Sequence, residues 1–188
     1  MEERIALREW AVAVDALASG RQVIVLRKGG IAEETKEFKL ESPRFFLFPS
    51  YEHQKPHLMK EEARAAVLST QAEALADPDT VRIAYYAEAT HDLEVTDEET
   101  LLRLDALHVW THDYAAERLK WKKTKPLHVL VLRVYALDEP VMLPVDERYG
   151  GCKSWLNIPA IDSDARRPVL SDERFEERVR EVLECVNG

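Results

Sequence analysis

The segment from residue 48 to residue 54 contains the side chains best suited to acid–base chemistry. It reads Phe-Pro-Ser-Tyr-Glu-His-Gln and lies between a predicted strand and a predicted helix, a place where loops often carry function. Glu52 could orient His53 as a general acid or base, while Tyr51 and Gln54 could contact a base edge or a carbonyl group. The structural alternative is a loop that caps the next helix and buries an aromatic ring.

The same region contains two histidines at a spacing that metal ligands can have, but their placement does not predict a metal site. His53 and His57 are four residues apart, but Pro56 lies between them and His53 should precede the helix. The two rings therefore need not share a face, as a pair of helical metal ligands would. We predict no metal site and no cofactor.

Arg27, Lys28, Gly29 and Gly30 form a second candidate site, at the end of a predicted strand. Successive glycines can turn backbone N–H groups toward an anion, and the two cations would add positive charge. The pattern is typical of a phosphate-binding turn. The alternative is a tight turn flanked by solvated cations.

The segment 118–125 gathers five cations around one tryptophan in a chain that is otherwise acidic. Trp121 could stack on a base while Lys122 and Lys123, with their cationic neighbours, contact phosphates. The alternative is the end of a helix whose cations complement the helix dipole, with Trp121 packed inward.

The segment 149–155, Tyr-Gly-Gly-Cys-Lys-Ser-Trp, is the fourth candidate. Cys152 beside Lys153 could act as a thiolate nucleophile, and Lys153 and Trp155 could contact a ligand. No histidine is tied to Cys152 by its position in the sequence. A structural turn anchored by Trp155 is the alternative.

Composition limits the classes of function. A chain of 188 residues with 46% apolar and 32% charged residues is typical of one globular domain, here residues 1–188. A net charge of −9 argues against nonspecific coating of nucleic acid or of an acidic membrane, although a local basic site is compatible with it. The sequence contains no Walker-type loop, no Gly-x-Gly-x-x-Gly, no Gly-x-Ser-x-Gly and no His-Glu-x-x-His. With no secretion signal or membrane span in view, we expect a cytoplasmic protein with two reduced cysteines.

Several elements must position the candidate residues in the first half of the chain. Helical periodicity predicts a helix over 4–19 and the apolar run after it a strand over 21–28. Short strands are expected over 37–40 and over 44–48, the latter stopped by Pro49.

The middle of the chain alternates between helices and a strand. A long helix is expected over 56–76, with a buried stripe that includes Val67, Leu68 and Leu75. Alternation predicts a strand over 81–88. A short helix should follow, opened by a capping box of Thr96 and Glu99, and another helix over 112–122.

The last third should supply the centre of the sheet. Residues 127–137 form the strongest predicted strand, and residues 141–145 could pair beside it. Ser171 is expected to cap a final helix. The irregular order of elements predicts an α+β fold: one mixed, largely antiparallel sheet of about five strands, with a barrel-like sheet as an alternative, packed by four or five helices.

The four candidate segments together resemble one known family. Leu26–Ile31, Leu47–Gln54, Pro126–Tyr135 and Gly150–Trp155 are similar, in order and combination, to the bacterial domain of unknown function 1802 family. The resemblance extends from about residue 5 to residue 158. It implies a link to DNA or defence work, because relatives are associated with a restriction-endonuclease-type domain, and it implies no catalytic residue. The opening helix and the strand after Gly20 are also similar to small barrels of the pseudouridine-synthase-and-archaeosine-transglycosylase type.

Three functions follow as hypotheses. The first is a module that binds nucleic acid or a nucleotide, with Arg27, Lys28 and the 120–125 cluster on phosphates and Tyr51, His53, Gln54 or Trp121 on a base. The second is a phosphodiester hydrolase in which Glu52 orients His53. The third is a protein-interaction or regulatory domain, which requires the candidate side chains to be mostly buried.

Overall fold

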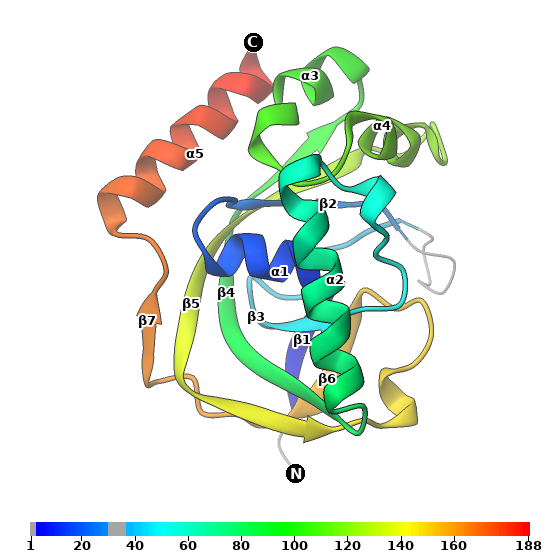
Figure 1. Cartoon of the computed structure of the whole chain (residues 1–188). Coiled ribbons are helices and arrows are strands. Elements are labelled where there is room, and N and C mark those ends of the chain that lie inside the picture. The colour runs from blue at the N-terminus through cyan, green and yellow to red at the C-terminus, as the bar shows by residue number, and fades with distance from the viewer. Residues whose placement is uncertain (1–2, 30–36) are drawn as a thin grey trace.

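The computed structural model describes residues 3–29 and 37–188 (Figure 1). Within these residues the α+β class is confirmed, with five α-helices and seven strands. The strands are β1 (Glu3–Trp10), β2 (Ile24–Arg27), β3 (Arg44–Ser50), β4 (Thr80–Val95), β5 (Leu127–Pro144), β6 (Trp155–Pro159) and β7 (Arg166–Pro168). The helices are α1 (Ala11–Ala18), α2 (Glu61–Ala76), α3 (Glu98–Arg103), α4 (His112–Lys120) and α5 (Asp172–Asn187). Short 3-10 turns are η1 (Pro56–Leu58), η2 (Asp105–Leu107) and η3 (Glu147–Tyr149).

The sheet is mixed and largely antiparallel, as predicted. Its order is β2-β5-β4-β3-β1-β6, with β7 added to β5. β1 and β3 are parallel, whereas the other described pairs are antiparallel. The path among the described strands ends at β2 and β6, which do not pair with each other, so the barrel-like alternative is not realised as a closed barrel.

The predicted helix over 4–19 is wrong in its first half, which is strand β1. Helix-favouring residues occur throughout 3–10, but β1 lies between β3 and β6 and pairs with both, so tertiary pairing overrides local propensity. Both faces of β1 contribute core residues, because Ala6 and Leu7 belong to apolar clusters on opposite sides of the sheet. Only 11–18 form a helix, α1, which is apolar nearly all round.

Two short-strand predictions also need correction. Residues 37–40 form no strand; Phe38 is buried against Trp155, so packing explains its apolar character. β3 does not stop before Pro49 but runs to Ser50. β4 pairs with β3 only as far as Phe46, and a proline beyond that point removes no hydrogen bond to β4.

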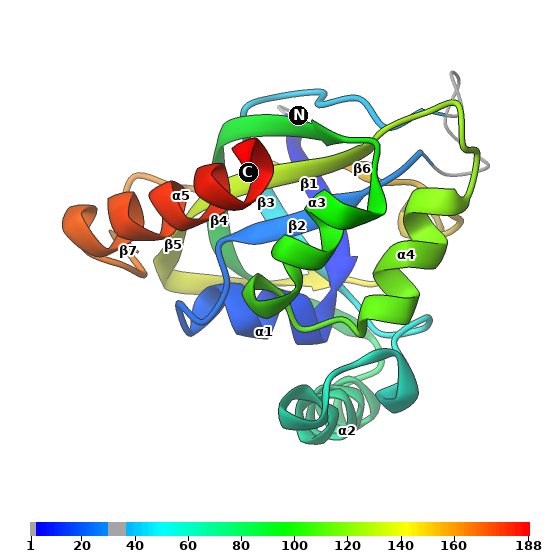
Figure 2. The same ribbon diagram turned by 90° about the horizontal axis from the view of Figure 1, so that it is seen from above.

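The predicted helix over 56–76 is divided. Residues 56–58 form η1, Met59 makes an isolated bridge to Trp110, and α2 begins only at Glu61. Figure 2 shows α2 at the periphery, where it packs on α1. The stripe was partly wrong: Val67 is buried, but Leu68 is 62% and Leu75 80% exposed. None of the described helices is long and apolar enough to cross a membrane.

β4 and β5 form a long curved ribbon that spans the molecule (Figure 1). The predicted strand over 141–145 is the continuation of β5, not a separate strand beside it. Register shifts at Ile83/Tyr85 and Ala89/His91 bend the ribbon.

The helix caps were predicted with mixed success. α3 is capped by Asp97, whose carboxylate accepts from the Thr100 N–H, rather than by Thr96. The cap of α5 by Ser171 is confirmed. α4 ends at Lys120, two residues earlier than expected.

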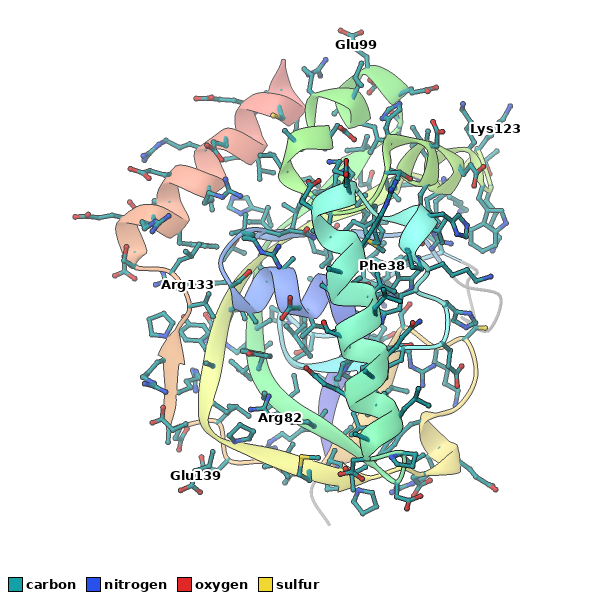
Figure 3. The ribbon with its side chains drawn as sticks, viewed as in Figure 1. Phe38, Arg82, Glu99, Lys123, Arg133 and Glu139 are labelled. Atoms are coloured by element: carbon teal, nitrogen blue, oxygen red, sulfur yellow. The ribbon has the colours of Figure 1, made fainter. Side chains whose placement is uncertain are left out.

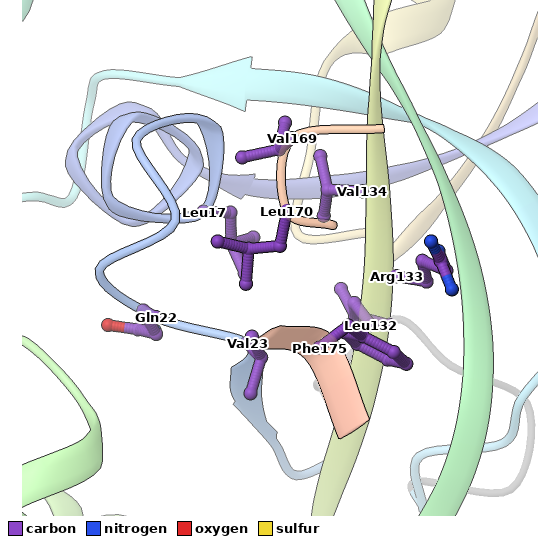
Figure 4. Close-up of a pocket in the computed structure, with 9 residues that line it drawn as sticks. All are labelled: Leu17, Gln22, Val23, Leu132, Arg133, Val134, Val169, Leu170 and Phe175. Atoms are coloured by element: carbon purple, nitrogen blue, oxygen red, sulfur yellow. The ribbon is translucent and has the colours of Figure 1, made fainter. Parts of the chain in front are cut away.

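A small cavity lies where α5 meets the sheet (Figure 4). Leu17, Leu132, Leu170 and Phe175 contribute to its walls, and its volume of about 10 Å³ has room for one water molecule at most. Gly20, with φ +72°, lies so close to Leu170 that a Cβ there would overlap the leucine side chain. This region is a packed seam rather than a ligand site.

Candidate functional site

A cleft of about 500 Å³ is formed by segments that are far apart in the sequence. Its walls come from residues within 48–53, 74–81 and 145–151, together with Arg8. Figure 1 shows the loop after β5 beside the C-terminal end of α2. Parts of two of the four candidate segments, 48–54 and 149–155, thus meet in one place.

The parallel pairing of β1 and β3 sets the floor of the cleft. Arg8 is the register partner of Phe48, and its guanidinium lies 6.0 Å from the centroid of the Phe48 ring. Arg8 Nη1 donates to the carbonyl oxygen of Gly151, which ties β1 to the loop after η3. Gly151 has φ +82°, a conformation that favours glycine. On the other wall the ring of Tyr149 packs at 5.2 Å from that of Phe48.

The cleft combines one arginine with several carboxylates. Asp77 accepts from the Thr80 hydroxyl at 2.6 Å, and Asp146 accepts from the Arg148 backbone N–H at 2.8 Å, so both carboxylates have a local partner. The hydrogen bond from Arg148 lowers the pKa of Asp146. Glu52 and Glu147 also line the cleft.

Burial changes the acidity of two groups in the cleft. It lowers the pKa of Arg8, against which the nearby Glu52 carboxylate acts. It raises the pKa of the Tyr51 phenol, and the Glu73 carboxylate adds to that effect. An arginine side chain stays protonated in proteins, and the raised pKa keeps the Tyr51 phenol neutral at neutral pH.

Glu52 and His53 both line the cleft and are exposed. Among the described contacts, none joins the Glu52 carboxylate to the His53 ring, so the orienting pair of the hydrolase hypothesis is not formed here. Within residues 3–29 and 37–188, no group of three or more metal-ligating side chains is close enough to hold an ion. The hydrolase remains a prediction.

Gln54 has a structural role instead of a cleft position. It is buried; its Oε1 accepts from the Val12 N–H at 3.0 Å and its Nε2 donates to the Thr70 hydroxyl at 2.8 Å. The side chain therefore satisfies the first turn of α1 and links it to α2. A binding role for Gln54 would require both bonds to break.

Lys28 is buried and Arg27 is partly buried. Arg27 forms an ion pair with Glu9 at 3.2 Å and donates to the Ser154 hydroxyl at 2.7 Å. Lys28 is 2% exposed and donates from Nζ to the carbonyl oxygen of Leu119. The alternative of a tight turn expects solvated cations, and the phosphate-binding turn expects cations that face a ligand. Arg27 and Lys28 instead have partners within the protein.

The glycines after Lys28 are explained in part. A Cβ on Gly29 would overlap the backbone of Glu37, so a close approach of two segments requires glycine there. Gly30, the other half of the predicted turn, lies outside the described residues.

Residues of the cationic segment 118–125 form hydrogen bonds with Lys28. Arg118 donates to the carbonyl oxygen of Lys28 at 3.1 Å, and its guanidinium lies 5.3 Å from the Trp121 ring. Lys122 has φ 51° and places Nζ 4.3 Å from the same ring. Lys120 and Lys125 pair with acids, Glu98 and Glu37 respectively.

This segment is well separated from the cleft. Lys123 is exposed and lies beside α4 in Figure 3, whereas Arg82, whose charge acts on Tyr51 of the cleft, lies toward the opposite end of the molecule. The four candidate segments therefore do not converge at one site. A binding role of Trp121, Lys122 and Lys123 stays a prediction.

In the segment 149–155, the turn anchored by a tryptophan is what the structure contains. Trp155 donates from its indole N–H to the Lys39 carbonyl oxygen at 2.8 Å and packs on Phe38 and Phe45. Cys152 and Lys153 are exposed. Lys153 is thus available at the edge of the loop that carries Gly151.

The sequence predictions did not include Arg8 among the site residues. The sequence predicts a helix over 4–19, and a helix gives Arg8 no defined relation to residue 48. An alternation of polar Arg4 and Arg8 with apolar Ile5 and Leu7 is the signal that could have indicated a strand.

Comparison with known proteins supports a family rather than an activity. The model of the family described as "Domain of unknown function (DUF1802)" matches residues 6–181. A mutant ZmASCH protein from Zymomonas mobilis has a similar solved structure, with 12% identity, 94% coverage of each chain and a TM-score of 0.42. That value is too low to carry an argument about fold or function. No curated protein matches the chain.

Proposed function

The chain belongs to the domain of unknown function 1802 family, and from its cleft we propose that it binds single-stranded nucleic acid by taking up one base. The observation that carries the proposal is the meeting of two distant loops around one arginine and several aromatic rings. The volume of about 500 Å³ lies within the range of pockets that bind small molecules, and exceeds what a single base requires.

The lining suits a planar ring better than a phosphate. Phe48, Tyr51, His53 and Tyr149 supply aromatic surface, on which a base of any kind can stack. Several carboxylates share the cleft with Arg8 and would repel a polyphosphate placed inside. A base can enter such a site while its phosphates stay outside.

Cations on the bordering segments would meet the phosphates. Lys55 follows the 48–54 loop, Lys153 follows Gly151, and Arg82 lies on β4 next to the wall at Val81; all three are exposed. Such contacts supply affinity without reading sequence. The protein-interaction hypothesis required buried candidate side chains, and the exposure of His53 and Lys153 does not favour it. The link to restriction or defence stays a prediction.

The first test compares two exposed histidines. His53→Ala should weaken binding of a labelled single-stranded oligonucleotide about tenfold, because loss of one stacking ring costs roughly 1–3 kcal/mol. Fluorescence anisotropy with DNA and RNA, with and without Mg²⁺, would measure it.

His57→Ala is the matched control, since His57 is also exposed but lies outside the cleft lining. The affinity of this variant should equal that of the wild type. Absence of any binding at micromolar protein would overturn the proposal. Mg²⁺-dependent cleavage that disappears with His53→Ala would replace it with the hydrolase.

A second pair of variants tests which surface meets the phosphates. Lys153→Glu should weaken binding several-fold and reduce the slope of log affinity against log salt by about one. Lys123→Glu changes the same charge on the distant 118–125 segment and should leave affinity and slope unchanged. The reverse result would move the phosphate path to that segment.

A further inference from the structure

The cleft contains two side chains of opposite charge, Arg8 and Glu52, and the charge of Glu52 acts on the guanidinium of Arg8. Arg8 rises from β1 and Glu52 from the loop after β3, and both line the same cavity. Arg8 uses one of its N–H groups on the Gly151 carbonyl oxygen, which fixes the guanidinium against the floor. A ligand that fills the cleft would meet both the donor fork of Arg8 and the acceptor carboxylate of Glu52.

We infer that the cleft selects guanine among the bases, with Arg8 donating to guanine O6 and N7 and Glu52 accepting from guanine N1–H and N2–H₂. This inference rests on the proposed function and gives that function its specificity. It concerns a base in a single strand, whose Watson–Crick edge is open.

Guanine alone among the four bases fits both groups at once. Its O6 and N7 acceptors suit a bidentate arginine, which is the commonest specific contact to a base. Beside O6 it carries two adjacent donors, N1–H and N2–H₂, that a carboxylate can accept together. Adenine has a donor where guanine has O6, so Arg8 would face a like group. Cytosine and thymine lack the purine N7 acceptor.

The remaining carboxylates of the cleft are less suited to this role. Asp146 is held by Arg148, with 3.0 Å between its carboxylate and Nε of that arginine, and Asp77 is held by Thr80. Glu147 also lines the cleft, within η3. Glu52 is the carboxylate whose charge acts on Arg8.

The test uses oligothymidine strands that differ at one central base, read by fluorescence anisotropy with the full chain. A central guanine should bind about tenfold more tightly than adenine, since a good bidentate pair discriminates by roughly 1–3 kcal/mol. Inosine, which lacks the N2 amino group, and 7-deazaguanine, which lacks N7, should each lose several-fold relative to guanine.

Glu52→Gln should abolish the difference between guanine and inosine while the affinity for adenine stays within about twofold. Glu61→Gln, at an exposed carboxylate of α2 outside the cleft lining, should change neither. Arg8→Lys should remove the penalty for 7-deazaguanine; if that variant fails to fold, Glu52→Gln still decides. Equal binding of the strands with guanine, adenine, cytosine or thymine at the centre, or a preference for a base other than guanine, would overturn the guanine inference. It would leave the proposal of a base-binding cleft intact. If no strand binds, the proposed function itself fails.

Discussion

Arg27→Ala should lower the free energy of unfolding by about 3–5 kcal/mol, because it leaves the Glu9 carboxylate buried without its partner. Glu9 is 3% exposed, and the Arg27 guanidinium lies 3.2 Å from its Oε2. Burial raises the pKa of Glu9, because the interior disfavours its charged form. Arg27 also donates to Ser154 and to the Arg8 carbonyl oxygen, so three segments lose a common anchor.

Urea unfolding followed by circular dichroism measures this effect, with Arg44→Ala as the control. Arg44 is exposed and pairs with the partly buried Glu88 at 3.8 Å, and pairs at the surface contribute about 1 kcal/mol at most. A Glu9→Leu and Arg27→Leu double variant should recover part of the loss, since replacing both partners removes the unpaired charge. If Arg27→Ala costs no more than Arg44→Ala, the interior pair is not the anchor described above.

The sequence was most informative where local chemistry and packing agree. Ser171 followed by acids predicts the start of α5, and the run of apolar residues from Leu127 predicts the strongly paired strand β5. Each of these signals is contained in a short stretch of consecutive residues and needs no distant partner. They were enough to predict the α+β class and the mixed sheet.

Elements governed by distant partners could not be predicted in this way. β1 is a strand because β3 and β6 pair with it on both sides, and neither lies near it in sequence. The consequence for function is direct: alternation along β1 sends Arg8 to the cleft and Glu9 to the interior, whereas a helix would have placed them differently.

Polar residues posed the same problem in another form. Gln54 and Lys28 have side chains suited to a ligand, but both satisfy backbone groups inside the protein. Residue type states which bonds a side chain can form and not which partners lie within reach. His53 precedes Gln54 in the same predicted loop, but it is exposed and lines the cleft. The two residues therefore differ in burial, which the sequence does not reveal.

Because of His108, the free energy of unfolding should fall by about 3 kcal/mol as the pH falls from 6.5 to 4. Burial, with a smaller contribution from Lys60, lowers the pKa of His108 from 6.5 to about 4. Between these values the unfolded chain binds a proton that the folded chain does not, so this stability is complete above pH 6.5 and falls with pH. One pKa unit corresponds to about 1.4 kcal/mol, which gives the size of the loss. Urea unfolding at half-unit steps of pH measures it.

His108→Phe removes the titrating ring from a position that is 4% exposed and packs against Trp110, with 5.8 Å between ring centroids. Its stability should therefore fall less steeply over this range, by about the amount that His108 contributes. His57→Ala removes an exposed histidine and should keep the full dependence. Since carboxylates titrate near the lower end of the range in both variants, only the difference between the two curves reports on His108. Identical curves would mean that the ring takes up its proton without unfolding, which requires water or a carboxylate to reach it in the folded state.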